Sequence, residues 1–397
     1  MGKFNLPNIK IPKFNFPFKK GGKGAPVKKS KGKAKFSLAD IQNIISNLKK
    51  GGKKLPVGLD IGSHSIKVCH LHEEDNAYSL LSIGSAILPA GAVEEGTLQD
   101  AEAVSKVITA LMKNLKIKEK RVAVTVSGYS VIVKKINLSV MAEKELDEYI
   151  HAEAGQYIPF DIEDVYLDYQ DLKTNTEGHE RTDVMLVAAR KDVVDAYLAM
   201  LRSVGLLAVL VDVDGFALEN SHEFCAAAKD ESVVLVDIGA SKMSINIIAE
   251  GLSVLARDVV LGSRQLTEQI QSQFGIDAEE AEALKIGRQP AEDKQGELED
   301  IFVNSCTQWA LETKKAIDLF YTNNPEGTLK KMILSGGGSR IKGLPEFFHE
   351  ETGLSIEIFD PFVTISFDHE KINPDYVRYM APEMAICTGL AIRESVL

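Results

Sequence analysis

The sequence contains the same hairpin pattern twice, and this repeat constrains the fold more than any other feature. Residues 55–68, LPVGLDIGSHSIKV, and residues 233–248, VVLVDIGASKMSINII, each read as an apolar strand, Asp-Ile-Gly, a small residue and a second strand. Alternating apolar residues on both sides of a short polar turn predict a β-hairpin. Helical and strand patterns alternate after each hairpin, so we predict an α/β protein built from two related halves that face each other.

The turns of both hairpins carry groups that suit a phosphate and its metal ion. These residues are Asp60, Gly62, Ser63 and Lys67 in the first turn and Asp237 and Gly239 in the second. Turns rich in backbone N–H groups bind anions, and Mg²⁺ prefers carboxylate and phosphate oxygens. A single Asp-x-Gly turn has an ordinary structural explanation, so it is the matched pair that favours a ligand site.

A third glycine-rich element follows in MILSGGGSRIKGL, residues 332–344. Gly336, Gly337 and Gly338 lie between a predicted strand and a predicted helix, where bare backbone lets a planar ligand approach. The alternative is a tight strand-to-helix turn with no ligand. The segment is neither a Walker loop, because Leu344 stands at the lysine position, nor a G-x-G-x-x-G fingerprint.

The N-terminal segment differs in composition from the rest of the chain. Residues 1–54 contain 15 lysines and one acid, whereas residues 55–397 carry a net charge of −25. Phenylalanines alternate with the lysines, and a short amphipathic helix is predicted from Ser37 to Gly51. We predict a basic, disordered tail that contacts an anionic membrane or an acidic partner surface. The alternative is an arm that only keeps the protein soluble.

The composition also limits the class of protein. Its four cysteines are far apart, which indicates reduced thiols rather than disulfides or a zinc site. No apolar run is long enough to span a membrane, and no signal peptide is evident. We therefore expect a cytoplasmic protein, and we expect no nucleic-acid partner.

These motifs resemble those of the actin-like ATPases, and more closely those of the PilM family of type IV pilus assembly proteins. The stretches EAGQYIPFDIEDVYLDYQ, VAARKDVVDAYLAML and LSGGGSRIKGLPEFF extend the resemblance over about residues 55–397. The resemblance implies duplicated actin/ribonuclease-H-like domains with an FtsA-like inserted lobe. It places domain I at 55–230 with the lobe near 128–178, domain II at 231–380, and a C-terminal helix, 381–397, that returns to domain I.

The resemblance also implies roles for particular residues in binding ATP or ADP with Mg²⁺. Asp60 and Asp237 would hold the metal, and Ser63, Lys67 and Gly239 would contact phosphate. Glu282 and Lys285 would lie against the adenosine, although an ion pair on one helix face is the alternative. The glycines at 336–338 would cover the adenine. Ser263 stands at a position that is commonly glycine in the family.

Catalysis and function are implied less directly. Asp214 stands where relatives orient water for hydrolysis, but an N-cap of the following helix is an equally simple explanation, so we expect at most a slow ATPase. The resemblance implies a cytoplasmic scaffold at the inner membrane. Its expected partner is the short cytoplasmic peptide of a PilN-like bitopic protein, and other pilus components, including motor ATPases, are further candidates. The alternatives are an FtsA-like filament-forming ATPase and a small-molecule kinase of the same fold.

Overall fold

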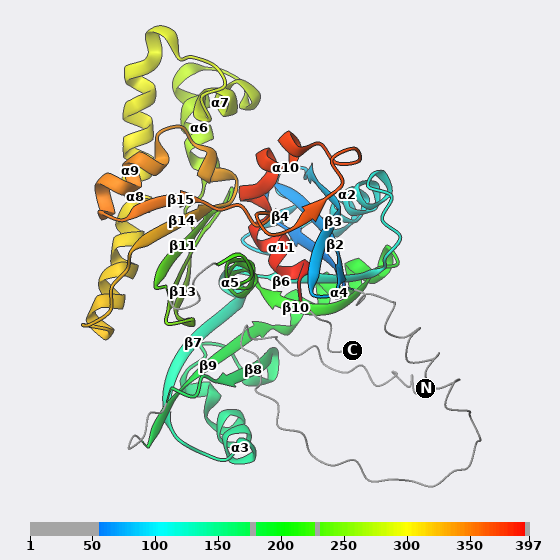
Figure 1. Cartoon of the computed structure of the whole chain (residues 1–397), viewed down its shortest axis with the longest axis vertical. Helices are drawn as coiled ribbons and strands as arrows, with labels where there is room; N and C mark the ends of the chain where they lie inside the picture. Colours follow the sequence, from blue (N-terminus) through cyan, green and yellow to red (C-terminus); the bar gives the residue numbers. More distant parts are fainter. Residues whose placement is uncertain (1–54, 175–179, 227–230, 394–397) are drawn as a thin grey trace, which may run out of the picture.

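The computed structural model describes residues 55–174, 180–226 and 231–393, and it contains two large sheets (Figure 1). The first sheet comprises β1 (Val57–Ile61), β2 (Ser65–Glu74), β3 (Ala77–Ile87), β6 (Arg121–Val126), β10 (Leu207–Val213) and β16 (Ser366–Phe367). The second comprises β11 (Val233–Ile238), β12 (Met243–Ala249), β13 (Leu252–Val259), β14 (Lys331–Ser335) and β15 (Ser355–Ile358).

The two sheets share the topology of five strands. Their orders are β10-β6-β1-β2-β3-β16 and β13-β12-β11-β14-β15, so the first sheet has one additional strand, β16, paired with β3. In each sheet the central strand, β1 or β11, is the first strand of a three-stranded antiparallel meander, and two parallel strands lie on its other side. The duplication predicted from the repeated Asp-Ile-Gly hairpins is therefore confirmed.

Helices cover both faces of the first sheet, and this is why β1 is buried along its whole length. The helices α2 (Ala101–Asn114) and α4 (Lys191–Ser203) share one hydrophobic cluster with β1 and β2. The opposite face packs against α10 (Pro374–Met380) and α11 (Ala385–Ala391). Between β3 and α2 lies a short hairpin of β4 (Val93–Glu94) and β5 (Thr97–Leu98).

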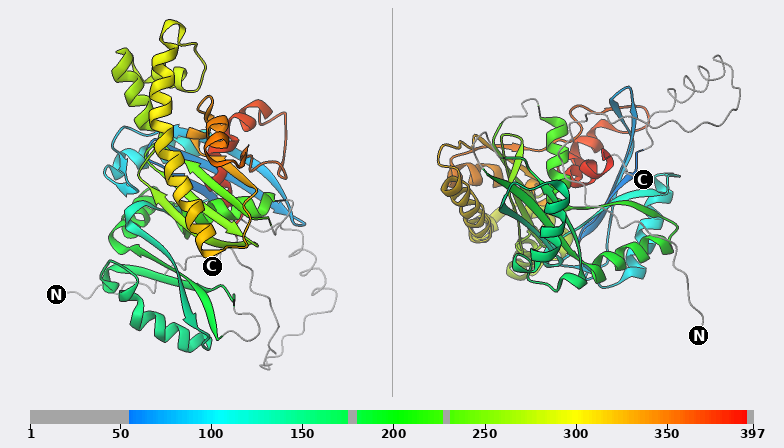
Figure 2. Two further views of the ribbon diagram at one scale, coloured as in Figure 1. Left: turned by 90° about the vertical axis from the view of Figure 1, so that its left-hand side faces the viewer. Right: turned by 90° about the horizontal axis from the view of Figure 1, so that it is seen from below.

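The second sheet forms its own hydrophobic cluster with four helices. These are α6 (Ser263–Phe274), α7 (Ala278–Lys285), α8 (Gln295–Asn323) and α9 (Leu344–Thr352). The indole of Trp309 in α8 is almost completely buried in this cluster. In Figure 2, α6, α7 and one end of α8 form the end of the molecule opposite the inserted lobe.

The helix α5 (Asp214–Cys225) lies between the two sheets and packs against α11 (Figure 1). The two helices approach so closely that a Cβ atom on Gly389 would lie 1.7 Å from the carbonyl oxygen of Ala217. Only glycine fits at this crossing. Leu218 of α5, Leu235 of β11 and Leu390 of α11 share one hydrophobic cluster, which joins the two halves.

The inserted lobe has a separate three-stranded sheet and its own small core. Its strands are β7 (Val131–Ser139), β8 (Val165–Asp171) and β9 (Arg181–Arg190), in the order β7-β9-β8, and α3 (Glu143–Glu153) covers one face. The predicted lobe end at residue 178 is therefore too early. The central strand β9 begins only at Arg181, and local composition could not show that this strand pairs antiparallel with both β7 and β8.

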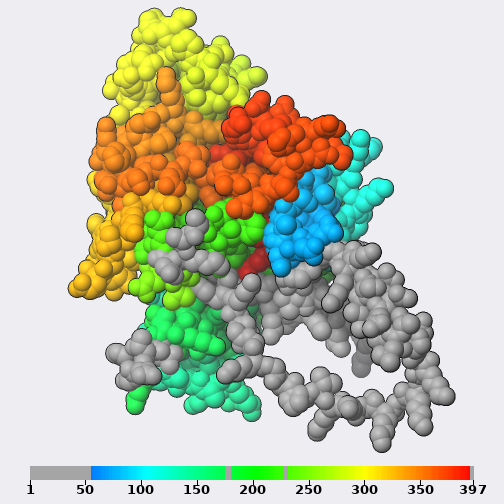
Figure 3. All heavy atoms as spheres, viewed as in Figure 1, coloured from blue at the N-terminus to red at the C-terminus, as the bar shows by residue number. Residues whose placement is uncertain are grey.

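The chain also returns to the first half earlier than predicted. The strand β16 pairs with β3, and α10 packs on the β2–β3 face, so the return begins before residue 381. In Figure 3 this orange-red segment lies beside the blue strands β2 and β3. Over the described part of the predicted C-terminal helix, 381–397, the chain forms a 3₁₀ turn, η6 (Ala381–Met384), followed by α11.

Three further expectations concern the chain as a whole. Cys69, Cys225, Cys306 and Cys387 are free thiols, and all but the half-buried Cys225 are buried. Among the described residues, no helix combines the length and the apolar character needed to cross a membrane. The predicted basic tail and its amphipathic helix lie outside the described residues.

Candidate functional site

The two Asp-Ile-Gly turns have the same backbone construction. The N–H of Gly62 donates to the carbonyl of Ser65 at 3.1 Å, and the N–H of Gly239 donates to the carbonyl of Lys242 at 2.9 Å. Each hydrogen bond closes a tight turn between antiparallel strands. The local sequence repeat therefore corresponds to a repeated local structure.

The two turns also meet in space. The Ser63 hydroxyl donates to the Ser241 hydroxyl at 2.8 Å, across 178 positions of sequence. Arg264, in the first turn of α6, binds both loops: its backbone N–H donates to the carbonyl of Ala240 at 2.9 Å, and its guanidinium donates to the carbonyl of Ser63 at 2.9 Å. The two turns thus come together at the contact between the halves.

The carboxylate of the first turn faces a lysine on the next strand. Asp60 and Lys67 are paired across the hairpin, and the ammonium lies 3.1 Å from the carboxylate. Burial raises the pKa of Asp60, and the charge of Lys67 opposes this shift. Burial acts to lower the pKa of Lys67, but the nearby carboxylates of Asp60, Glu383 and Asp237 raise it overall, so the lysine stays charged.

The carboxylate of the second turn has a neutral partner instead. The Ser335 hydroxyl donates to Asp237 at 2.8 Å. Burial raises the pKa of Asp237 to about 6, although this hydrogen bond and the charge of Lys67 oppose the shift. A cation placed between the two carboxylates would relieve their mutual repulsion.

Lys242 connects the second turn to Asp214. Its ammonium lies 2.7 Å from Asp214 and 2.8 Å from Asp258. Asp258 also accepts a hydrogen bond from the N–H of Gly128, where the inserted lobe begins. Asp214 is not the N-cap of α5: Val213 occupies the cap position, and Asp214 is the first residue of the helix.

The three glycines of the glycine-rich turn have different roles. Gly336 has a φ of 78°, and a Cβ atom there would lie 2.5 Å from the carbonyl oxygen of Ile238. A Cβ atom on Gly338 would lie 2.3 Å from the Ile238 side chain. These two glycines are therefore required by packing against the second hairpin. A Cβ atom on Gly337 would have its nearest neighbour, Glu383, at 3.7 Å, so the absence of a side chain there has no packing explanation.

Glu282 and Lys285 form the ion pair that was the alternative to an adenosine contact. Their charged groups are 2.6 Å apart, and the Lys285 ammonium also donates to the Thr267 hydroxyl at 2.9 Å. The lysine is buried, which lowers its pKa against the opposing charge of Glu282. Ser263 begins α6, and its N–H donates to the carbonyl of Gly239 at 2.9 Å.

The structure thus brings the two Asp-Ile-Gly turns and the glycine-rich turn together. Ser241, Lys242 and Arg264 of this site were not predicted from the sequence. Ser241 and Lys242 lie inside the second repeat, so aligning the two hairpins position by position draws attention to them. Nothing in the local sequence around Arg264 indicates that it reaches the first turn.

The donor chemistry fits Mg²⁺ bound together with a nucleotide. Among the described residues there is no group of three or more His, Cys, Asp or Glu side chains that could hold a metal ion alone. Mg²⁺ commonly binds one or two carboxylates and completes its shell with water and phosphate oxygens. Asp60 and Asp237 supply carboxylates of this kind.

Comparison with known proteins identifies the class and then the family. A structure described as the PilM–PilN type IV pilus biogenesis complex is similar with a TM-score of 0.75 and 28% identity, over 85% of this chain and 98% of that chain. The ethanolamine utilization protein EutJ from Carboxydothermus hydrogenoformans has a TM-score of 0.51 and 15% identity, over 88% and 96% of the two chains. The fold is the mixed α/β fold of the actin-like ATPases, as predicted.

The family follows from the sequence match. The model of the family described as type IV pilus assembly protein PilM matches residues 58–395. The chain therefore belongs to the PilM family.

Proposed function

We propose that this protein is an ATP-binding scaffold of the type IV pilus machine, held at the cytoplasmic face of the inner membrane by a PilN-like partner. The observation that carries the nucleotide part is the contact between the two Asp-Ile-Gly turns through Ser63 and Ser241. The similarity to a chain of the PilM–PilN complex supports the partner.

In this proposal ATP or ADP lies between the halves, with its phosphates on the two turns. Lys67 and Ser63 would contact phosphate oxygens, and Gly62 and Gly239, whose own N–H groups close the two turns, would let the phosphates approach the backbone. Asp60 and Asp237 would hold Mg²⁺, which supplies positive charge to offset the phosphates. Gly337 leaves room for the flat adenine base beside the glycine-rich turn. Glu282 and Lys285 of α7 would lie against the adenosine.

Hydrolysis in this site would be slow. Asp214 is the residue placed to orient water, because it begins α5 close to the second turn. Its carboxylate already forms an ion pair with Lys242, so its capacity to accept a further proton or to orient water is reduced. This ion pair favours a nucleotide that stays bound as a ligand over one that is rapidly hydrolysed.

Nucleotide and partner peptide would be coupled through the base of the lobe. A chain of contacts runs from Lys242 of the second turn to Asp258 and then to the N–H of Gly128. A ligand that closes the site would therefore bias the position of the lobe. Such coupling is typically about 1–3 kcal/mol and must be reciprocal.

Calorimetry on the full chain with Mg-ATP and Mg-ADP tests the nucleotide proposal. Gly337→Trp should abolish binding, because the indole would fill the space beside the turn, whereas Gly337→Ala should bind normally. Gly296→Trp is the matched control, since a Cβ atom at Gly296 meets nothing within 4 Å. No measurable binding by the unaltered chain, or normal binding by Gly337→Trp, would reject the site.

The coupling has a separate test. The cytoplasmic peptide of a PilN-like partner is titrated into the full chain with and without Mg-ATP, and an affinity change of about five- to 150-fold is expected. Equal affinities would leave the scaffold proposal standing and remove the nucleotide switch.

A further inference from the structure

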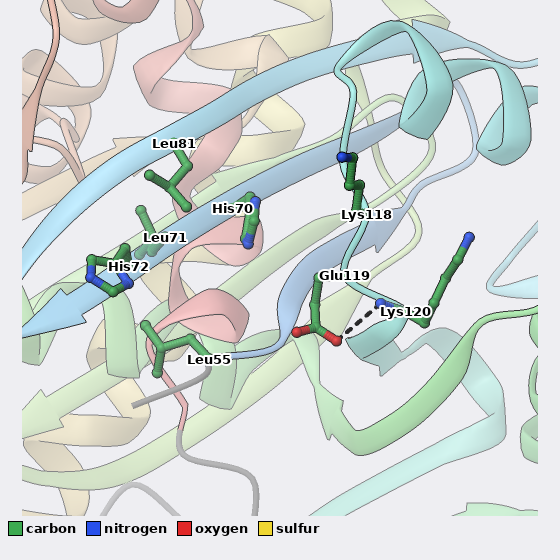
Figure 4. A pocket seen from close by; sticks show the side chains of 8 residues that line it. All are labelled: Leu55, His70, Leu71, His72, Leu81, Lys118, Glu119 and Lys120. Carbon is green, nitrogen blue, oxygen red and sulfur yellow. Dashed lines mark hydrogen bonds between the residues drawn. The ribbon is translucent and has the colours of Figure 1, made fainter. Parts of the chain in front are cut away.

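A pocket of about 400 Å³ lies at the edge of the first sheet, at the end where the described chain begins. Its lining residues are Leu55, His70, Leu71, His72, Leu81, Lys118, Glu119 and Lys120. Figure 4 shows the residues of the α2–β6 connection on one side and the β2 histidines on the other. This pocket lies outside the turns that form the candidate nucleotide site, and no step proposed above uses it.

The lysine-bearing wall of the pocket has a fixed backbone. The buried Ile117 anchors the connection in the core, and its N–H donates to the carbonyl of Met112 at 3.0 Å. The N–H of Leu207 at the start of β10 donates to the carbonyl of Lys120 at 2.8 Å. Lys118 and Lys120 are exposed side chains on this anchored segment.

The acidic residue in the pocket is neutralised within its own segment. Glu119 accepts hydrogen bonds from the Arg121 guanidinium at 3.1 and 3.2 Å, and from the N–H groups of Lys120 and Arg121 at 3.0 Å each. The hydrogen bond from the Arg121 side chain is the largest of the effects that lower the pKa of Glu119 to about 2. The net positive charge of the wall therefore comes from Lys118 and Lys120.

This positive wall is unusual on the body of the protein. Residues 55–397 have a net charge of −25, yet residues 113–121 contain five basic residues and one acid. The 54 residues that precede Leu55 carry a net charge of +14. The basic segment of the body thus lies beside the point where the basic tail joins it. Leu81, 48% exposed, adds an apolar side chain to the rim.

We propose that this pocket binds the phosphate-bearing headgroup of an anionic lipid and so determines which face of the body meets the membrane. The ammonium groups of Lys118 and Lys120 and the rings of His70 and His72 supply donors for phosphate oxygens. Leu81 is placed to enter the interfacial region. An acidic body approaches an anionic surface only through a positive face, so the charge pattern favours the lipid over a free anion. The tail itself has the same sign of charge as the pocket and is a poor occupant.

Vesicle co-sedimentation with the full chain is the first test, comparing phosphatidylcholine vesicles with and without phosphatidylglycerol. Lys118→Ala/Lys120→Ala should weaken binding to the anionic vesicles about tenfold or more, since each lysine near such a surface contributes roughly fivefold. Lys144→Ala/Lys315→Ala is the matched control. It removes the same charge from exposed positions on α3 and α8 and should change binding less than twofold. Equal losses in the two double variants would reject a specific pocket.

Hydrogen exchange on the same full-chain samples locates the contact. Anionic vesicles should protect the backbone N–H groups of residues 115–120 and of 70–72 in β2 from exchange. The Lys118→Ala/Lys120→Ala variant should lose this protection. Protection confined to residues 1–54 would overturn the proposal. The same protection produced by inorganic phosphate alone would assign the pocket to a free anion instead. Protection present without vesicles and lost on removal of residues 1–54 would assign it to the chain's own tail.

Discussion

The two Asp-Ile-Gly hairpins share a backbone but differ in how their charges are compensated. Asp60 forms an ion pair with Lys67 within its own hairpin, whereas Asp237 accepts a hydrogen bond from the neutral Ser335 hydroxyl. The lysine of the second hairpin, Lys242, pairs outside it with Asp214 and Asp258. The first hairpin thus pairs its carboxylate with its own lysine, whereas the lysine of the second hairpin connects the two halves and the base of the lobe. The difference indicates that a duplicated turn can keep its backbone construction while its side chains take different structural roles.

The largest expected effect follows from removing each carboxylate in turn. Asp60→Ala leaves the Lys67 ammonium, whose side chain is 17% exposed, without its ion-pair partner, although Glu383 and Asp237 remain nearby, and should lower the free energy of unfolding by about 2–3 kcal/mol. Asp237→Ala leaves only a hydroxyl without its acceptor and should cost about 1–2 kcal/mol. Urea unfolding of the full chain measures both. Equal losses would show that the two carboxylates are compensated alike.

A pH dependence should come from Glu219, which the first half buries against the second. Its carboxylate accepts hydrogen bonds from Asn246 and Ser253 at 2.7 Å each, yet burial raises its pKa to about 7. The folded state therefore holds the proton more tightly than the unfolded state, and stability should fall as pH rises from about 4.5 to 7. The fall attributable to this residue is roughly 2–3 kcal/mol. Glu219→Gln should remove it, and an unchanged pH profile in this variant would contradict the assignment.

The glycine-rich turn packs against the second hairpin, and its glycines should respond differently to substitution. Gly336→Ala forces a positive φ on alanine and a contact with the Ile238 carbonyl, so a loss of about 1–2 kcal/mol is expected. Gly337→Ala should change stability by less than about 0.5 kcal/mol. Thermal unfolding of both variants distinguishes them. A comparable loss at Gly337 would mean that packing also explains that glycine.

The smallest expected effect concerns hydrolysis. Phosphate release should proceed well below the median enzyme turnover of about 10 per second. Asp214→Asn should lower it by about tenfold or less, because Lys242 already neutralises this carboxylate. A turnover near the median would contradict the slow-ATPase proposal. An unchanged rate in the variant would remove Asp214 from catalysis without affecting nucleotide binding.

Much of the fold could be predicted because its signals are local. The strands near 56–61 and 65–71, their counterparts in the second half and the helix near 191–204 follow from short-range apolar periodicity. The secondary structure of residues 344–380 is not predictable from local sequence to the same extent. Its elements are short, and β16 has only two residues, so pairing with a distant strand defines it more than its own sequence does.

The sequence by itself determined the duplicated hairpins, the residues of the three turns and the contrast between a basic tail and an acidic body. Each of these depends on residue type and spacing over short stretches of chain. Only the tertiary structure decided which polar side chains interact. Lys242 pairs with Asp214, and Ser63 bonds to Ser241, because the two halves pack against each other. It also decided that Gly336 and Gly338 serve the packing on Ile238 while Gly337 does not. Such distinctions depend on distances between residues far apart in sequence, and these are set only when the two sheets close around α5.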